Sequence, residues 1–317
     1  MSGLNFRTDM ADERVDEYKK VNNLSEVDGI KVETKDLDIA KITTVDVLNE
    51  NGKCALGKDI GKYITIEIDD VEYLTEDIKE RIIDVVSEKI KLLVGDNLNS
   101  ILVVGLGNEY VTPDALGPKV VSFVNVTRHA IKYAKELVEE GTREISALSP
   151  GVMGMTGIET EEIIEAVVKK TNPQMLIVID SLASLSMSRL GKTIQLGNTG
   201  ITPGAGVGNS RHTLNFETLK IPVIAIGVPT VVDQATITNE AIDKVIKTVQ
   251  NEAINYSNHG IDVKKVEEVF KLFDNSNRYN MIANILHTEN YIVTPKEIDQ
   301  IIAKISEIIA SAINKAI

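Results

Sequence analysis

Residues Ile101 to Pro118 read Ile-Leu-Val-Val-Gly-Leu-Gly-Asn-Glu-Tyr-Val-Thr-Pro-Asp-Ala-Leu-Gly-Pro, and the rest of the chain is organised around this stretch. It opens with a short apolar run that is typical of a buried strand. The run ends at Gly105 and Gly107, where the backbone turns sharply or lets another group approach closely. Asp114 then stands just before a helical pattern begins. An acid in a loop after a buried strand lies at the edge where open α/β sheets place their functional groups.

A second stretch has the same layout, because the apolar run of residues 175–179 leads directly into Asp180. The carboxyl ends of parallel strands share one edge of a sheet, so we predict that Asp114 and Asp180 face each other as a catalytic pair. One acid would then keep its proton while the other activates water. The alternative is structural, with Asp114 capping a helix from Ala115 and Asp180 capping one from Ser181.

Apolar runs and helical patterns alternate through residues 72–233, which predicts an α/β core with a mostly parallel sheet and helices on both faces. Residues 10–28 suggest a short helical segment, and the alternating residues 29–71 a small antiparallel β subdomain. Residues 234–317 read as a helical C-terminal region packed on the core. The predicted elements are strands at 101–104, 144–148, 175–179, 193–196 and 223–226, and helices at 75–95, 115–139, 159–170, 235–257, 262–273, 278–288 and 295–316. Thr75 is predicted to cap the first of these helices and Thr294 the last.

The composition limits the function classes. The 317 residues carry 47 acidic and 34 basic side chains, a net charge of -13, which disfavours nucleic acid as a partner. The single cysteine, Cys54, excludes an internal disulfide and indicates a reducing cytoplasm. No apolar run reaches the ~20 residues of a membrane helix, and we expect neither a membrane partner nor a secretory signal.

Glycine-rich loops follow several of the predicted core strands. Their backbone N–H groups are candidates for binding a substrate chain or an oxyanion, although glycine is also common at sharp turns. The candidates are Gly105, Gly107, Gly151, Gly154, Gly204 and Gly206.

Other chemistries have weaker support. We predict no metal and no cofactor, since no HExxH or zinc-finger spacing occurs. His129 with the two acids leaves open a metallopeptidase. A Ser–Lys pair of Ser181 or Ser184 with Lys192 rests only on closeness in sequence.

Several motifs together resemble the germination protease family of spore-forming bacteria. They are Phe6-Arg-Thr-Asp-Met-Ala-Asp-Glu13, Val103-Val-Gly-Leu-Gly-Asn108, Val111-Thr-Pro-Asp-Ala-Leu-Gly-Pro118, Val126-Thr-Arg-His129, Ser149-Pro-Gly-Val-Met-Gly154, Thr156-Gly-Ile-Glu-Thr160, Ile179-Asp-Ser-Leu-Ala183, Pro203-Gly-Ala-Gly-Val-Gly-Asn209 and Val223-Ile-Ala-Ile-Gly-Val-Pro-Thr-Val-Val-Asp233. The likeness runs from Arg7 to Asp233.

The resemblance implies an endopeptidase that degrades the small acid-soluble proteins coating spore DNA at germination. It implies an atypical aspartic protease with Asp114 and Asp180 as its catalytic residues, and a fold similar to hydrogenase maturation peptidases. It further implies a zymogen that trims its own N-terminus, a homotetramer, and a cytoplasmic location in the forespore and spore core. A non-enzymatic alternative is an acidic scaffold that binds basic spore proteins.

Family substrates are cut after an acidic residue, which by resemblance places self-processing between Asp9 and Met10 and makes residues 1–9 a prosegment. An acid before the cut implies a basic subsite, because an arginine fork suits a carboxylate. The candidates for this subsite are Arg128, Arg189 and Arg211, and those for an apolar pocket on the other side of the cut are Val152, Met153 and Met155.

Overall fold

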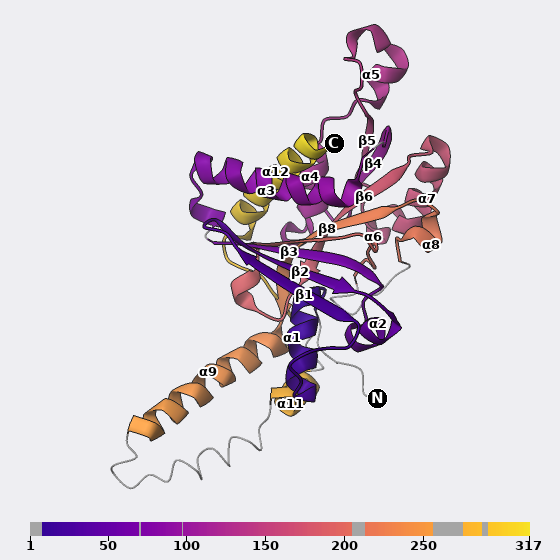
Figure 1. The fold of residues 1–317 in the computed structure, drawn as a ribbon. Helices are drawn as coiled ribbons and strands as arrows, with labels where there is room; N and C mark the ends of the chain where they lie inside the picture. The colour runs from indigo at the N-terminus through magenta and orange to yellow at the C-terminus, as the bar shows by residue number, and fades with distance from the viewer. Residues whose placement is uncertain (1–7, 70, 97, 205–212, 256–274, 287–290) are drawn as a thin grey trace.

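The computed structural model describes residues 8–69, 71–96, 98–204, 213–255, 275–286 and 291–317. Their strands form a nine-stranded sheet in the order β1-β2-β3-β7-β8-β6-β4-β5, with β9 (Ile292–Val293) pairing with β8 (Figure 1). The parallel part comprises β4 (Ser100–Gly105), β5 (Glu144–Leu148), β6 (Met175–Ala183) and β8 (Val223–Asp233). The predicted α/β class and its parallel core are confirmed.

The strands of the N-terminal part are antiparallel, as their alternation predicts. They are β1 (Ile30–Asp36), β2 (Ala40–Val47) and β3 (Gly61–Ile68). They do not stand apart from the core, because β3 pairs antiparallel with β7 (Thr193–Gly197) and so extends the same sheet. A helix that the sequence did not reveal, α2 (Glu50–Leu56), lies between β2 and β3 in the chain, and the Asn49 side chain caps it.

Helices cover both faces of the parallel strands. On one face, Ile101 and Val103 of β4 pack in a cluster with α3 (Glu76–Val94), α4 (Leu116–Ser122) and α12 (Ile298–Ala316). On the other, Leu102 and Val104 pack against α7 (Thr160–Thr171) and α8 (Phe216–Leu219). Burial on both sides explains why this strand is a continuous apolar run.

Two predicted helices differ from the observed ones. Residues 115–139 form α4 and, after a break at 123–127, α5 (Arg128–Tyr133), which projects from the body (Figure 1). The C-terminal helix begins at Ile298 and not at Pro295. The predicted Thr294 cap is wrong because the Thr294 hydroxyl donates instead to the Thr230 carbonyl, at 2.9 Å.

The rest of the helical C-terminal region divides into two parts. Its last helix, α12, packs on the core, whereas α9 (Gln234–Asn255) extends away from the body and shares a small apolar cluster with α11 (Asn275–Ile285) (Figure 1). The predicted helix at 262–273 lies outside the described residues. Within the described ranges, no helix combines the length and apolar character needed to cross a bilayer.

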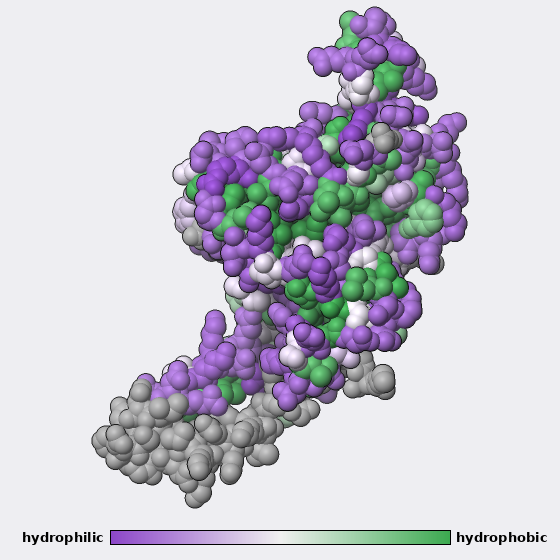
Figure 2. Space-filling view, in the orientation of Figure 1, coloured by the Kyte–Doolittle hydropathy of each residue, from purple (hydrophilic) through white to green (hydrophobic). Residues whose placement is uncertain are grey.

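The apolar surface is broken up by polar side chains on the face of the molecule that Figure 2 shows. Hydrophobic residues gather there over the sheet and its covering helices, and hydrophilic residues, drawn in purple, surround them.

The remaining described elements are short or peripheral: α1 (Ala11–Asn22), α6 (Met153–Thr156) and the 3₁₀ turns η1 (Val71–Tyr73), η2 (Thr112–Asp114), η3 (Lys135–Leu137) and η4 (Met187–Arg189).

Replacement of Gly105 tests the close packing at the end of β4. A Cβ there would lie 2.1 Å from the Gly117 carbonyl oxygen, so Gly105→Ala forces a backbone shift. We expect a loss of about 3 kcal/mol in the free energy of unfolding, the upper end of overpacking costs, measured by urea denaturation. The control is Gly154→Ala, whose Cβ meets nothing within 4 Å. Equal stability of the two variants would contradict this account.

Candidate active site

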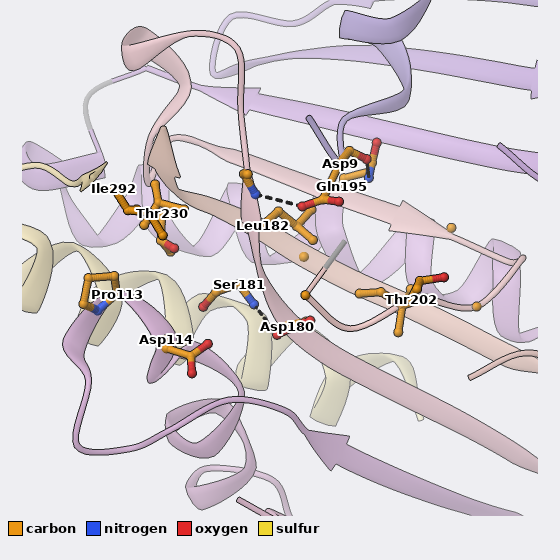
Figure 3. A pocket seen from close by; sticks show the side chains of 18 of the residues that line it. Asp9, Pro113, Asp114, Asp180, Ser181, Leu182, Gln195, Thr202, Thr230 and Ile292 are labelled. Carbon is orange, nitrogen blue, oxygen red and sulfur yellow. Dashed lines mark hydrogen bonds between the residues drawn. The ribbon is translucent and has the colours of Figure 1, made fainter. Parts of the chain in front are cut away.

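A cavity of about 430 Å³ opens at the carboxyl ends of the parallel strands, where the sheet changes to antiparallel pairing (Figure 3). Its wall contains three acids from distant parts of the chain: Asp9, Asp114 and Asp180. The wall also includes Lys58 and Gln195 from the antiparallel part of the molecule. The predicted edge of the sheet therefore does bring Asp114 and Asp180 into one cavity.

Asp114 ends the 3₁₀ turn η2, between β4 and α4. The Asn108 N–H donates to its Oδ2 at 2.8 Å, so the carboxylate serves the loop and not the first turn of α4. The helix begins after Ala115 with no side-chain cap, and the capping alternative is therefore not observed. Burial raises the pKa of the Asp114 carboxyl, and the hydrogen bond from Asn108 partly offsets this.

Asp180 lies within β6, which continues to Ala183, so it caps no helix. Its side chain accepts a hydrogen bond from the Ser181 N–H at 2.9 Å and is 7% exposed. Burial holds the pKa of Asp180 well above its ordinary value, and the negative charges of Asp114 and Asp9 raise it further. The pKa of Asp180 is raised more strongly than that of Asp114, which makes Asp180 the candidate for the acid and Asp114 the candidate for the base.

The loop after β4 brings Asp114 close to the strand ends. Gly107 has φ +108°, and a Cβ there would lie 2.0 Å from the Asp114 carbonyl oxygen and 3.0 Å from Asp114 Oδ1. Glycine at this position lets η2 pack directly on the loop. Figure 3 shows the Asp114 carboxyl group turned towards the part of β6 that carries Asp180.

The segment that contains the predicted processing site lies along the end of β6. The Asp9 N–H donates to the Ala183 carbonyl at 3.0 Å, and the Ala183 N–H donates to Asp9 Oδ2 at 2.9 Å (Figure 3). The next residues, Met10 and Ala11, are both 0% exposed. The Asp9 carbonyl oxygen accepts from Lys58 Nζ at 2.7 Å and from Gln195 Nε2 at 3.1 Å.

A buried polar network fixes this segment. The Glu13 carboxylate accepts from the Thr8 hydroxyl, from Ser184 Oγ at 2.5 Å and from the Leu185 N–H at 2.8 Å. Arg189 contributes a contact of 3.3 Å to Glu13 and one of 2.6 Å to Asp12. The network ties α1 to the residues immediately after β6, so it positions Asp9 at the cavity.

Of the three arginines predicted for a basic subsite, the two that the structure describes form ion pairs and do not line the cavity. Arg189 pairs with Asp12 and Glu13, and Arg128 pairs with Glu144 at 2.6 Å. Both are structural ion pairs. Arg211 lies outside the described residues.

The glycine loops contribute less than predicted. Of the six candidate glycines, Gly204 lines the cavity and Gly206 lies outside the described residues. Gly105 and Gly107 pack against backbone atoms of residues 114–117, while Gly151 and Gly154 have no place in its wall. The residues of the predicted apolar pocket, Val152, Met153 and Met155, do not line the cavity either. They belong to the loop and short helix after β5.

Two residues that no sequence pattern identified, Lys58 and Gln195, line the cavity. Lys58 and Gln195 belong to no motif, although a glutamine inside the buried strand 193–197 is an unusual signal. Within the described part of the chain, Ser181 Oγ and Thr230 Oγ1 are buried without a hydrogen-bond partner, and both residues line the cavity.

The described residues include no group of three His, Cys, Asp or Glu side chains arranged to hold a metal ion. His129, the third ligand of the metallopeptidase alternative, lies on the projecting helix α5 and does not line the cavity (Figure 1). The structure therefore does not bring His129 together with the two acids.

The chain is similar to germination proteases over nearly its whole length. It is 45% identical to the germination protease of Clostridium perfringens over 317 aligned residues, which cover 99% of this chain and 95% of that protein. Identity is 43% to the germination protease of Clostridium tetani, covering 99% and 96% of the two chains, and 38% to that of Priestia megaterium, covering 100% and 95%. A nickel–iron hydrogenase maturation protease from Thermococcus kodakarensis shares 18% identity with a TM-score of 0.29, over 45% of this chain and 80% of that one.

The family model described as germination protease matches residues 7–269, which include all three acids of the cavity. Together with the full-length similarity to three named relatives, this match shows that the chain belongs to the germination protease family.

Proposed function

We propose that this protease is an endopeptidase that cuts small acid-soluble spore proteins at germination, with Asp114 and Asp180 as its catalytic pair. The observation that carries the proposal is the cavity at the strand ends, in which the two acids lie with different environments. Burial and the negative charges of Asp114 and Asp9 raise the pKa of Asp180 well above its ordinary value, whereas burial raises the pKa of Asp114 against the hydrogen bond from Asn108. An acid and a base in one cavity are what amide hydrolysis requires.

In the proposed mechanism, Asp114 takes a proton from a water molecule as the water oxygen attacks the peptide carbonyl carbon. Asp180 donates its proton to the carbonyl oxygen and so limits the charge of the tetrahedral intermediate. The carbon–nitrogen bond then breaks while the nitrogen receives a proton from Asp114, and the carbonyl re-forms as the hydroxyl proton returns to Asp180. The products are a carboxylic acid and an amine, and both aspartates recover their starting states.

The same site is proposed to cut the chain itself between Asp9 and Met10, so that residues 1–9 are the prosegment of a zymogen. In support, Asp9 already lines the cavity, and its carboxylate accepts from the Ala183 N–H. An acidic residue before the cut in a protein substrate would bind in the same way. We further propose a homotetramer in the cytoplasm of the forespore and spore core, and these two proposals rest on the family resemblance alone.

The catalytic pair is tested by replacing each acid with its uncharged isostere. Asp114→Asn removes the base and Asp180→Asn removes the acid, so each should lower the cleavage rate by about 10²–10⁴-fold or more. The measurement is the appearance of fragments from an acid-soluble spore protein, together with trimming at Asp9–Met10. The control Asp84→Asn breaks a surface pair with Lys315 and should cut normally. Near-normal cleavage by a folded Asp114 or Asp180 variant would refute the pair.

The burial of the Asp180 carboxyl also predicts that the stability of the protein depends on pH. Folding raises the pKa of this carboxyl, so the folded state holds the carboxyl proton more tightly than the unfolded state does. The free energy of unfolding therefore falls as pH rises above the ordinary pKa of an aspartic acid. Asp180→Asn removes this loss, which amounts to about 1.4 kcal/mol for each tenfold difference in proton affinity between the folded and unfolded chains. In urea unfolding, the variant should match the wild type near pH 4 and become relatively more stable towards pH 7. A variant that becomes relatively less stable over this range would contradict the assignment.

Two other functions remain to be separated from this one. A metallopeptidase that uses the same acids as ligands should lose its activity after exhaustive chelation and regain it with a divalent cation. We expect the chelated wild-type protein to retain full cleavage of the spore protein. A non-catalytic scaffold would bind the basic spore protein and yield no fragments at any time, with or without the chelator.

A further inference from the structure

We propose that Lys58 and Gln195 are catalytic residues that bind the carbonyl group of the residue before the cut and stabilise the negative charge that develops on its oxygen before Asp180 protonates it. In the uncut chain, the group that they hold is the Asp9 carbonyl. This inference rests on the proposed cleavage at Asp9–Met10. It assigns the oxyanion donors to two side chains and not to the glycine loops.

The position of Lys58 differs from that of a structural lysine. Its ammonium group lies in the cavity wall and donates to the Asp9 carbonyl oxygen at 2.7 Å, and it forms no ion pair within the described residues. Nearby lysines are neutralised by acids: Lys53 lies 2.9 Å from Asp59, and Lys62 lies 2.5 Å from Asp46. A half-buried cation directed at a peptide carbonyl in a cavity is costly for stability and useful for polarising that carbonyl.

Gln195 spans the bond that is proposed to be cut. Its Nε2 donates to the Asp9 carbonyl oxygen at 3.1 Å, while its Oε1 accepts from the Ala11 N–H at 2.7 Å. One side-chain amide therefore holds the backbone on both sides of Met10. Ala183 adds two further hydrogen bonds to Asp9, so the segment is bound as an extended substrate would be.

Two donors at one carbonyl oxygen form the arrangement that catalyses acyl transfer in many hydrolases. Charge moves onto that oxygen when water adds to the carbonyl carbon, and donors that are already in place stabilise it more than the neutral ground state. Lys58 supplies a full positive charge for this purpose. The loss of one such donor typically lowers kcat by about 10²–10³-fold.

The protonation of Lys58 depends on pH in the range just above neutrality. Burial lowers the pKa of its ammonium group to about 8, against the attraction of Asp9 and Asp59. The other groups that face it are Arg14 of α1, which also lowers this pKa, and the Tyr63 ring of β3. Lys58 is therefore charged below about pH 8, and the rate that depends on it should fall above that pH.

The test starts from the full-length chain in which residues 4–9 are replaced by a foreign protease site. After folding, the foreign protease removes the prosegment from every variant, whether or not the variant can trim itself. Each trimmed protein is then given a synthetic peptide with the sequence of residues 4–14, and kcat and KM are measured for cleavage after the aspartate. Because Asp9 of the chain is gone, any effect of Lys58 must act on the added peptide.

We expect Lys58→Met to lower kcat by about 10²–10³-fold with little change in KM, and Gln195→Met to lower it less because a neutral donor is lost. Lys58→Arg keeps a charged donor and should retain part of the activity, without the fall above about pH 8 that the wild type shows. The matched control is Lys53→Met, whose lysine pairs with Asp59 and does not line the cavity.

A folded Lys58→Met protein whose kcat lies within threefold of the Lys53→Met value would overturn the inference and leave Lys58 as an anchor of the N-terminal segment. If Lys58→Met does not fold, an unaltered pH profile in Lys58→Arg together with a normal kcat in Gln195→Met would overturn it equally. Failure of the wild-type protein to cut any peptide refutes the proposed function instead, so the two failures are distinguishable.

Discussion

The site is built around one electrostatic constraint, the burial of the Asp180 carboxyl near the carboxyl end of the central strand β6. Burial alone disfavours its charge, and the nearby acids Asp114 and Asp9 disfavour it further. A flexible chain would move three such groups apart. The parallel strands prevent this because β6 is paired with β4 on one side and β8 on the other, and its side chains are packed on both faces.

The loop after β4 carries the second carboxyl group, that of Asp114, to the strand ends. Gly105 and Gly107 let this loop and the turn η2 approach within distances that no side chain would allow. That approach places the Asn108 N–H 2.8 Å from Asp114, and Asp180 receives its own N–H bond from Ser181. Since each acid has one donor, their difference rests mainly on depth of burial. Gly105 and Gly107 therefore affect the site indirectly, by allowing the loop and η2 to pack closely together.

Sequence patterns predicted those helices and strands that depend on local signals or on burial of both faces of a strand. The apolar runs before Gly105 and Asp180 identified the central strands, and the cap at Thr75 identified α3. Lys58 and Gln195 could not be predicted to meet, because their closeness depends on the antiparallel pairing of β3 with β7. The sequence predicts an antiparallel group and a parallel group of strands, but no local sequence pattern shows that the two groups pair edge to edge. The choice of the Thr294 hydroxyl between a cap and a strand carbonyl is likewise a tertiary decision.

The N-terminal segment is held more firmly than a removable prosegment needs to be. Glu13 and Arg189 fix the part that follows Met10, and these contacts do not involve the residues before the proposed cut, except for Thr8. Cleavage would therefore release Asp9 and leave α1 in place. The loss of Asp9 removes one negative charge from the surroundings of Asp180 and frees the Ala183 N–H and the Lys58 ammonium group. The same groups that hold the uncut segment would then be available to the next acidic residue that enters the cavity.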